Sequence, residues 1–306
     1  MDVLVVNAGS TSLKLHLVRG DESRQVDDFV AADAVGHRVV HGGRRFVGPA
    51  RIDGAVEQAI EELAVLAPLH NRRALEEIGR ARQALPDVPH VAVFDTAFHR
   101  TLPPAASTYA VPERWREEWE VHRYGFHGIS VQWVASQVKA ERLVVCHLGG
   151  GCSVTAVRNG RSVDTTMGFS PLDGVPMATR SGSVDPEALL YLLRERLLTE
   201  EELGQALEHE SGLAGLSGGG SGDVREASAL ALDVFVHRLA GAASAMAAAC
   251  GGIDVLVFTG GIGEHADDVR DRIVERVRFL GEFRVEVVPA REELVIAAET
   301  RRLLEA

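Results

Sequence analysis

Short apolar runs that stop at glycines set the pattern of this chain. Three of them share one design, namely VLVVNAGSTSLK at 3–14, LVVCHLGGGCSV at 143–154 and VLVFTGGIGEH at 255–265. Each apolar run has the length and composition of a buried strand. The glycines that follow leave backbone N–H groups free beside a tight turn, an arrangement that suits phosphate oxygens. Three related strand ends of this kind, with isolated arginines and histidines between them in the sequence, indicate a cleft for phosphoryl transfer.

The first two of these segments predict the same hairpin, which indicates an internal duplication. A strand, a glycine turn and a second strand occur in both, and Asn159-Gly160 is a strong turn into a third strand in the second copy. Apolar residues at helical spacing fill most of the chain between the strands. The expected strands are Val3–Asn7, Leu13–Val18, His90–Phe94, Leu143–His147, Val154–Val157, Arg161–Asp164 and the run from Val255. The expected helices are Ala55–Leu66, Arg72–Leu85, Ser130–Ala140, Pro186–Leu198, Glu201–His209, Asp223–Cys250, Arg270–Leu280 and Arg291–Leu304.

Alternation of strands with helices predicts an α/β fold. The repeated hairpin predicts two similar lobes, each a mixed sheet with flanking helices and with a cleft between them. We expect the first lobe to comprise residues 1–95 plus about 282–306, and the second lobe to comprise residues 96–281.

Composition narrows the class of protein. The 306 residues carry a formal net charge of −12, and no Lys/Arg-rich run offsets it, which argues against non-specific nucleic-acid binding. Three cysteines without a CxxC pattern indicate a reducing compartment, with neither a disulfide framework nor a zinc site. No leader precedes the first strand, and the longest apolar stretch, around Ala242–Cys250, is shorter than the ~20 residues of a membrane span. We therefore expect a cytoplasmic protein.

A series of short strings runs through nearly the whole chain, namely NAGSTSLK (7–14), HRVVHGG (37–43), APLHN (67–71), FDTAFH (94–99), YGFHG (124–128), HLGGG (147–151), MGFSPLDG (167–174), TRSGSVDP (179–186) and TGGIGE (259–264). These strings and their order resemble the acetate kinase family, which belongs to the superfamily of sugar kinases, actin and heat-shock ATPases. The resemblance implies a magnesium-dependent (or manganese-dependent), reversible transfer of the ATP γ-phosphoryl to the carboxylate of acetate, giving acetyl phosphate and ADP, by a homodimer.

The resemblance implies catalytic roles for Arg38, Arg180 and His127. Guanidinium groups match the equatorial oxygens of a phosphoryl group in transfer and offset the repulsion between two anionic substrates. An imidazole at His127 can donate a hydrogen bond to the same group. Asp95 ends its strand and is a candidate to orient an arginine or to face the metal, although a strand-ending Asp is often only a cap. A structural salt bridge is the alternative role for each arginine.

Metal and nucleotide contacts are expected at the glycine turns. Asn7 and Glu264 are oxygen ligands of the kind that magnesium prefers. A loop at Gly218–Gly222 matches the family loop near the adenine but contains more glycine. The candidate nucleotide residues are Ser10, Ser12, Lys14, His147, Gly149, Gly151, Asp223, Arg225, Gly260, Gly261 and Gly263.

The resemblance also implies an apolar wall around the methyl group of the acid, formed by Val40, Leu69, Phe126 and Pro171. An apolar pocket discriminates between two acids that differ by one methylene by only about 1–3 kcal/mol. Propionate, butyrate or another short acid therefore remains an alternative substrate. The chain departs from the family at Gly150, where asparagine is usual, and it is short over Leu15–Gly36 and between Gly281 and Pro289. A nucleotide-binding regulatory protein that lost turnover is therefore the alternative from a different class.

Overall fold

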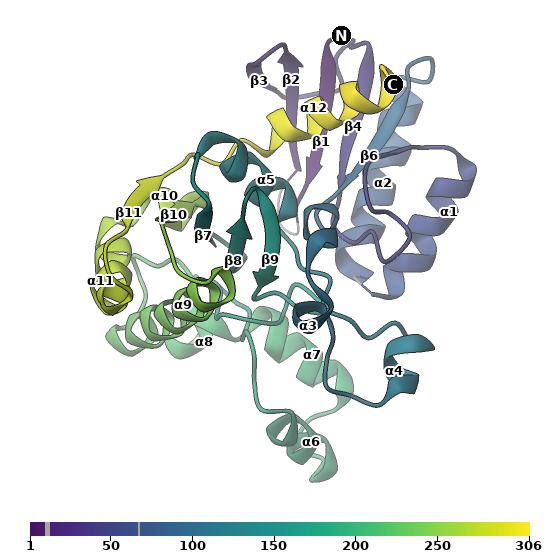
Figure 1. The fold of residues 1–306 in the computed structure, drawn as a ribbon. Helices are drawn as coiled ribbons and strands as arrows, with labels where there is room; N and C mark the ends of the chain where they lie inside the picture. The colour runs from purple at the N-terminus through teal and green to yellow at the C-terminus, as the bar shows by residue number, and fades with distance from the viewer. Residues whose placement is uncertain (10–12, 67) are drawn as a thin grey trace. The chain divides into compact units, whose positions relative to one another are not determined.

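The computed structural model describes residues 1–9, 13–66 and 68–306, with the side chains at 68 and 69 left aside (Figure 1). The chain divides into two compact units. The first comprises Met1–Thr101, Phe126–Ser136 and Ala290–Ala306, and the second comprises Leu102–Gly125 and Gln137–Pro289. The lobe boundaries expected at residue 95 and near residue 282 stay a prediction.

The first unit contains a six-stranded mixed sheet of order β3-β2-β1-β4-β6-β5. Strands β1, β2 and β3 form an antiparallel meander, whereas β1, β4 and β6 run parallel to one another. A two-residue strand, β5, pairs antiparallel with the outer side of β6. The strands are β1 Val3–Ala8, β2 Leu13–Arg19, β3 Glu22–Val26, β4 Ala34–Val39, β5 Ala50–Arg51 and β6 His90–Phe94.

Alternating residues of β1 face two different helical layers. Val3 and Val5 pack in one core with Ile296 of helix α12, which crosses in front of β1 and β4 in Figure 1. Leu4 and Val6 pack in another core with Ala81 of helix α2. Because both faces are covered, the strand is an unbroken apolar run rather than an alternating one. The helical segments of this unit are α1 Gly54–Glu62, η1 Leu63–Val65, α2 Pro68–Ala84, η2 Ala97–Thr101, α5 Gly128–Gln137 and α12 Glu292–Leu304.

The second unit contains a five-stranded sheet of order β11-β10-β7-β8-β9. Strands β7, β8 and β9 again form an antiparallel meander, and β7, β10 and β11 run parallel. The two sheets thus share one strand order, which confirms the predicted α/β class and the duplicated mixed-sheet architecture. The strands are β7 Arg142–Leu148, β8 Cys152–Arg158, β9 Arg161–Thr165, β10 Val255–Thr259 and β11 Arg284–Val287.

Several elements differ from the sequence expectations. Strands β3, β4, β5 and β11 were not expected, since each is short or carries polar residues. The expected helix Asp223–Cys250 begins only at Ala229, where the Ser228 side chain accepts from the backbone N–H of Ala231. Before that cap, Asp223 accepts the backbone N–H of Arg225, a local bond that competes with a helix. The helical segments of this unit are α3 Pro104–Ser107, α4 Glu113–Glu117, α6 Pro186–Arg194, α7 Glu200–His209, α8 Gly212–Leu216, α9 Ala229–Cys250, α10 Gly260–His265, α11 Asp267–Val277 and η3 Arg278–Leu280.

Helix α9 corrects the estimate of apolar length made from sequence. Among the described residues it is the one helix long and apolar enough to cross a membrane, with a mean hydropathy of 1.3 over an 18-residue window. This criterion uses only length and composition, and the core helix of a soluble protein also meets it. Phe235, Leu239 and Ala243 of α9 are fully buried, and the helix packs on β8 and α11. These contacts are those of a core helix.

Candidate active site

In the first unit, Arg38 and Asp95 form a buried ion pair at the ends of neighbouring parallel strands. Arg38 is near the end of β4, and Asp95 directly follows β6 and donates its backbone N–H to Val39 O at 3.0 Å. The guanidinium donates to Asp95 Oδ2 from Nη2 at 2.5 Å and from Nε at 3.1 Å. Their side chains are 13% and 1% exposed. Parallel strands end at the same sheet edge, which is why two residues 57 positions apart meet.

Asn7 and Glu292 extend this pair into a four-residue cluster. Asn7, near the end of β1, accepts from Arg38 Nη1 at 3.2 Å and donates from Nδ2 to Glu292 Oε2 at 2.9 Å. Glu292 is the first residue of α12, and its carboxylate lies 3.8 Å from Arg38 Nη1. The last helix of the chain therefore brings a second carboxylate to the sheet edge where β1, β4 and β6 end.

The charges of the cluster depend on one another. Burial alone would lower the pKa of Arg38, but the nearby carboxylates of Asp95 and Glu292 outweigh it and raise that pKa. Burial raises the pKa of the Asp95 carboxyl, and the Arg38 guanidinium opposes that rise. Asp95 Oδ1 is buried and has no hydrogen-bond partner among the described residues. The cluster thus holds a permanent cation with one carboxylate oxygen left unsatisfied.

His127 lies beside the same strand end in a strained conformation. Its φ is +58°, a left-handed value that costs a residue with a Cβ about 1–2 kcal/mol. The next residue, Gly128, donates its N–H to Asp95 O at 2.9 Å, and an added Cβ there would lie 2.0 Å from that oxygen. The packing of Gly128 against Asp95 therefore fixes the backbone of His127 near the backbone of Asp95.

A buried histidine anchors the segment that carries His127. His99 Nε2 lies 2.9 Å from Phe126 O, and because a carbonyl can only accept, this nitrogen carries the proton. Burial lowers the pKa of His99 to about 4, so the ring is neutral near neutral pH. A neutral His99 thus holds the backbone directly before His127.

In the second unit, the glycine turn after β7 lies beside the glycines that begin α10 at the end of β10. Gly149 N–H donates to Gly151 O at 3.0 Å and closes this turn. A Cβ added to Gly260 would lie 2.7 Å from Leu148 O, and Gly260 has φ +78°. A Cβ added to Gly149 would lie 3.8 Å from Gly261 N. Close approach of two backbones therefore requires glycine at 260, and it brings the predicted residues of both strings together.

Arg180 lies in a long irregular segment beside the Gly149–Gly151 turn. Its Nη1 is 3.5 Å from Pro171 O, and its charge acts on the thiol of Cys152, the residue that follows the Gly149–Gly151 turn. Burial nevertheless raises the pKa of Cys152 to about 12, so this residue stays a protonated core thiol. Arg180, Pro171 and the turn thus belong to one region of the second unit.

A polar network shapes the segment that carries Pro171 and Arg180. Ser183 Oγ donates to Asp173 Oδ1 at 2.5 Å, and Tyr109 Oη accepts from Phe169 N at 2.9 Å. Arg123 donates to the backbone oxygens of Thr165 and Thr166. Phe169, Asp173 and Ser183 lie in two of the quoted strings but had no role predicted for them, and Tyr109 and Arg123 were not predicted at all, because each acts through contacts between distant segments.

The remaining predicted residues divide between the units. Val40 and Phe126 are buried in the first unit, whereas Lys14 is exposed. Ser10 and Ser12 lie outside the described residues, as does the side chain of Leu69. In the second unit His147 and Glu264 are half-buried, and Gly263 is buried in α10. Asp223 and Arg225 pair with each other at the surface, where the guanidinium and backbone N–H of Arg225 lower the pKa of Asp223 to about 2.

Glu292 is the residue of the cluster that sequence reasoning missed. The available signal was an acidic residue at the start of a predicted terminal helix, a common feature of helices that have no catalytic part. Only the fold brings it 2.9 Å from Asn7, a residue 285 positions away.

The oxygen-rich donor set fits magnesium better than a transition metal. The described residues hold no group of three or more His, Cys, Asp or Glu side chains suited to a metal. Magnesium is bound by one or two carboxylates and keeps its other positions for water and phosphate. Asn7, Glu292 and the unsatisfied Oδ1 of Asp95 offer such a set.

Comparisons with known proteins agree with this geometry. Residues 22–299 match the model of the acetokinase family. The chain is 46% identical to the acetate kinase of Deinococcus deserti, over 89% of this chain and 78% of the relative. It is 45% identical to that of Protochlamydia amoebophila, over 89% of this chain and 73% of the relative.

Solved structures give the same result. A propionate kinase from Francisella tularensis superposes with a TM-score of 0.91 at 32% identity, covering 98% of this chain and 99% of the other. An acetate kinase from Entamoeba histolytica gives a TM-score of 0.89 at 28% identity, covering 100% of both chains. The family match includes Arg38, Asp95, Glu292 and the glycines at 149–151 and 260–261, and this chain belongs to the acetokinase family.

Proposed function

We propose that this protein transfers the γ-phosphoryl of ATP to the carboxylate of acetate, reversibly, giving acetyl phosphate and ADP. The observation that carries the proposal is the buried cluster of Asn7, Arg38, Asp95 and Glu292 beside the strained His127. Family membership supports the same reaction. An acetate oxygen forms a bond to the γ-phosphorus while the bond from that phosphorus to the β,γ-bridging oxygen breaks, and ADP leaves.

In this proposal Arg38 and Arg180 neutralise the anionic reactants. A carboxylate and a phosphate repel each other, so positive charge must be in place before they approach. Asp95 holds the Arg38 guanidinium through two bonds, which fixes its direction at little further entropic cost when substrate binds. His127 donates a hydrogen bond to the phosphoryl oxygens in the transition state. A carboxylate nucleophile needs no general base.

Asn7 and Glu292 would hold the magnesium or manganese ion, with Asp95 next to them, and Glu264 stays the ligand predicted from sequence. When bound, the ion supplies positive charge to the β- and γ-phosphates. The backbone at Gly149, Gly151, Gly260 and Gly261 would lie against the nucleotide, since a side chain would prevent that approach.

The acid is proposed to be acetate, with propionate as the second candidate. Val40 and Phe126 are buried and apolar, which suits a short alkyl group. Related structures include both an acetate kinase and a propionate kinase. Relative kcat/KM values for acetate, propionate and butyrate decide between them, and a value for propionate above that for acetate would reverse the assignment.

We further propose that the protein is a cytoplasmic homodimer. Helix α6 has no buried residue and exposes Leu190 and Tyr191 at 52% and 51%, as a helix does when a second copy covers it. Replacing both residues with Lys should give a monomer by light scattering. A molar mass equal to that of the wild type would show that α6 does not form the dimer contact.

The reaction is tested by trapping acetyl phosphate with hydroxylamine as the coloured hydroxamate. Purified protein with ATP, magnesium and acetate should give colour, and Arg180→Ala should lower the rate at least ~10²-fold. Arg158→Ala is the matched control, because Arg158 forms only an exposed pair with Glu141. If calorimetry detects ATP binding but no acid gives colour, the chain is instead a nucleotide-binding regulatory protein.

A further inference from the structure

The outer strand of the second sheet, β11, is an open edge. It pairs with β10 on one side, and no strand pairs with its other side in the described part of the chain. Val285 and Val287 are 43% and 42% exposed, and Phe279, just before the strand, is 73% exposed. An edge strand with unpaired backbone groups and exposed apolar side chains is a template for pairing with another strand.

The bonding to β10 determines which backbone groups face outward. Arg284 N–H donates to Asp254 O and Val288 N–H donates to Phe258 O, both at 2.9 Å. Backbone groups of a strand alternate sides along the chain. Residues 284, 286 and 288 therefore bond inward, and the N–H and C=O groups of 283, 285 and 287 point to the open edge.

We propose that β11 pairs antiparallel with β11 of a second copy of this chain, about a two-fold axis at Val285. In this register Val285 exchanges both backbone bonds with the second Val285, and Phe283 lies opposite Val287. Arg284 then faces Glu286 of the other copy, and Glu286 faces the other Arg284. Oppositely charged residues directly across a strand pair stabilise it.

The other two-fold axes within β11 (Arg284–Val287) are worse for reasons of charge or backbone bonding. An axis at Arg284 or at Glu286 would place like charges directly opposite each other, which destabilises a pair. An axis at Val287 would place Val285 opposite Pro289, which has no N–H to donate. The sequence Arg-Val-Glu-Val thus favours one self-complementary alignment, and this charge complementarity identifies the partner as a second copy.

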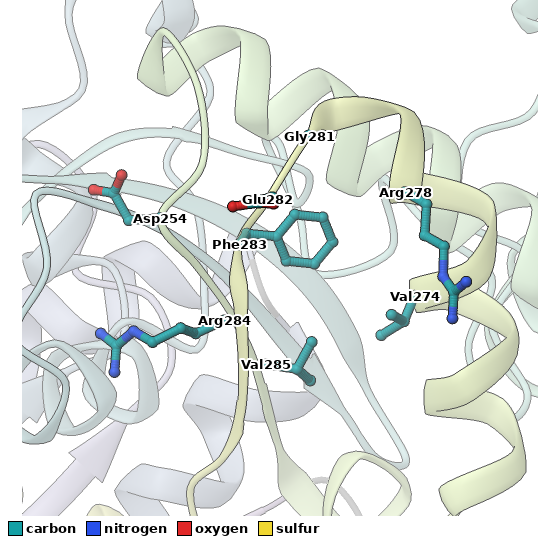
Figure 2. Close-up of a pocket in the computed structure, with 8 residues that line it drawn as sticks. All are labelled: Asp254, Val274, Arg278, Gly281, Glu282, Phe283, Arg284 and Val285. Atoms are coloured by element: carbon teal, nitrogen blue, oxygen red, sulfur yellow. The ribbon is translucent and has the colours of Figure 1, made fainter.

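The sheet face beside this edge has room for the partner's apolar side chains. A cavity of about 610 Å³ lies next to β11 and is lined by Val274, Arg278, Phe283 and Val285 among others. Figure 2 shows Phe283 and Val285 on the side of the strand that faces Val274, whereas Arg284 points to the other side. Val287 of the second copy, opposite Phe283, would enter this cavity.

Within one copy, Arg284 already donates to Glu286 at 2.6 Å. In the paired edge these two side chains and their two symmetry mates form a ring of alternating charge on one face. Assembly through β11 is independent of the proposed reaction, since none of its residues belongs to the candidate active site. It is also separate from the contact proposed for α6.

Two single charge reversals and their mixture test the proposal. Arg284→Glu and Glu286→Arg each place like charges opposite each other, so self-association should weaken about tenfold or more. Sedimentation measured from about 1 to about 100 µM should therefore show smaller species for each variant than for the wild type. An equimolar mixture should recover association, because one variant is acidic at both positions, the other is basic at both, and opposite charges then face each other across the pair.

Each single variant also loses the ion pair between Arg284 and Glu286 within one chain, whether it is alone or mixed. Recovery of association in the mixture can therefore come only from pairing between two chains. Unchanged hydroxamate formation by both variants serves as the folding control. The proposal is overturned if wild type and single variants sediment alike, or if the mixture associates no more than either variant alone.

Discussion

The two sheets have the same strand order but finish differently at their outer edge. In the first, β6 is wholly buried and a short strand, β5, pairs with its outer side through Ala50 and Arg51. In the second, the corresponding strand β11 is largely exposed and has no outer partner among the described residues. The same strand order therefore has its fifth strand, β6, covered in one unit, while the corresponding strand β11 is open in the other.

The sheets also differ in what they offer at the strand ends. The first ends in charged and polar side chains, with Arg38 on β4, Asp95 after β6 and Asn7 on β1. The second ends in glycine backbone, with the Gly149–Gly151 turn after β7 and the glycines that begin α10 directly after β10. Of the two similar units, the first thus supplies charged side chains at its strand ends, and the second supplies glycine backbone that another group can approach closely.

The largest effect is expected from breaking the buried Arg38–Asp95 ion pair at the ends of β4 and β6 in the first sheet. Arg38→Ala should lower the free energy of unfolding by about 3–5 kcal/mol, because Asp95 would remain buried as an unpaired charge. Turnover should fall at least ~10²-fold. The matched variant is Arg284→Ala in β11. Because the Arg284 side chain is 62% exposed, this variant should lower the free energy of unfolding by less than about 1 kcal/mol. Urea unfolding of both variants checks the contrast, and equal losses would contradict it.

Mild acid should weaken the first sheet more than the second. His37 and His90 stack in the first unit with Nε2 and Nδ1 2.9 Å apart, and burial lowers the pKa of both. A histidine with a lowered folded-state pKa binds its proton more readily when unfolded, so stability falls as pH drops below about 6.5. Each such histidine lowers the free energy of unfolding by up to about 1.4 kcal/mol per pH unit. His99, whose pKa is lowered to about 4, adds to this loss until the pH reaches that value.

Hydrogen exchange at pH 7 and pH 5.5 measures this difference by segment. Peptides covering β4 and β6 should lose more protection than peptides covering β7 and β10. His99→Asn, whose amide can also donate to the Phe126 carbonyl, should reduce the slope. Equal loss of protection in both sheets would show that the buried histidines do not set the acid limit.

The smallest effect is expected from a pair of glycine substitutions at the second sheet. Gly260→Ala should cost about 1–3 kcal/mol, because the residue has φ +78° and its Cβ would lie 2.7 Å from Leu148 O. A Cβ at Gly261 meets nothing within 4 Å, so Gly261→Ala should change stability by less than about 0.5 kcal/mol. If the Gly261 backbone lies against the nucleotide, the same variant should still raise the KM for ATP. Thermal unfolding and ATP titration separate the two effects.

The sequence by itself determined the strongly apolar strands, the duplicated hairpin and the family. The runs Val3–Asn7, Leu143–His147 and the one from Val255 lie buried between layers, so their apolar character is strong and local. The glycines at 149, 151, 260 and 261 were recognisable as short strings that follow an apolar run, and at Gly260 the positive φ and the close approach of Leu148 O restrict the position to glycine.

Only the tertiary structure decided which side chains meet and which edge stays open. Glu292 joins Asn7 because α12 returns to the first sheet, and no local pattern encodes a contact 285 residues apart. The strand β11 was missed because its exposed Arg-Val-Glu-Val sequence lacks the apolar signal of a buried strand. Its backbone forms a strand only because β10 offers an unpaired edge, and whether that edge is covered depends on the packing of the whole sheet.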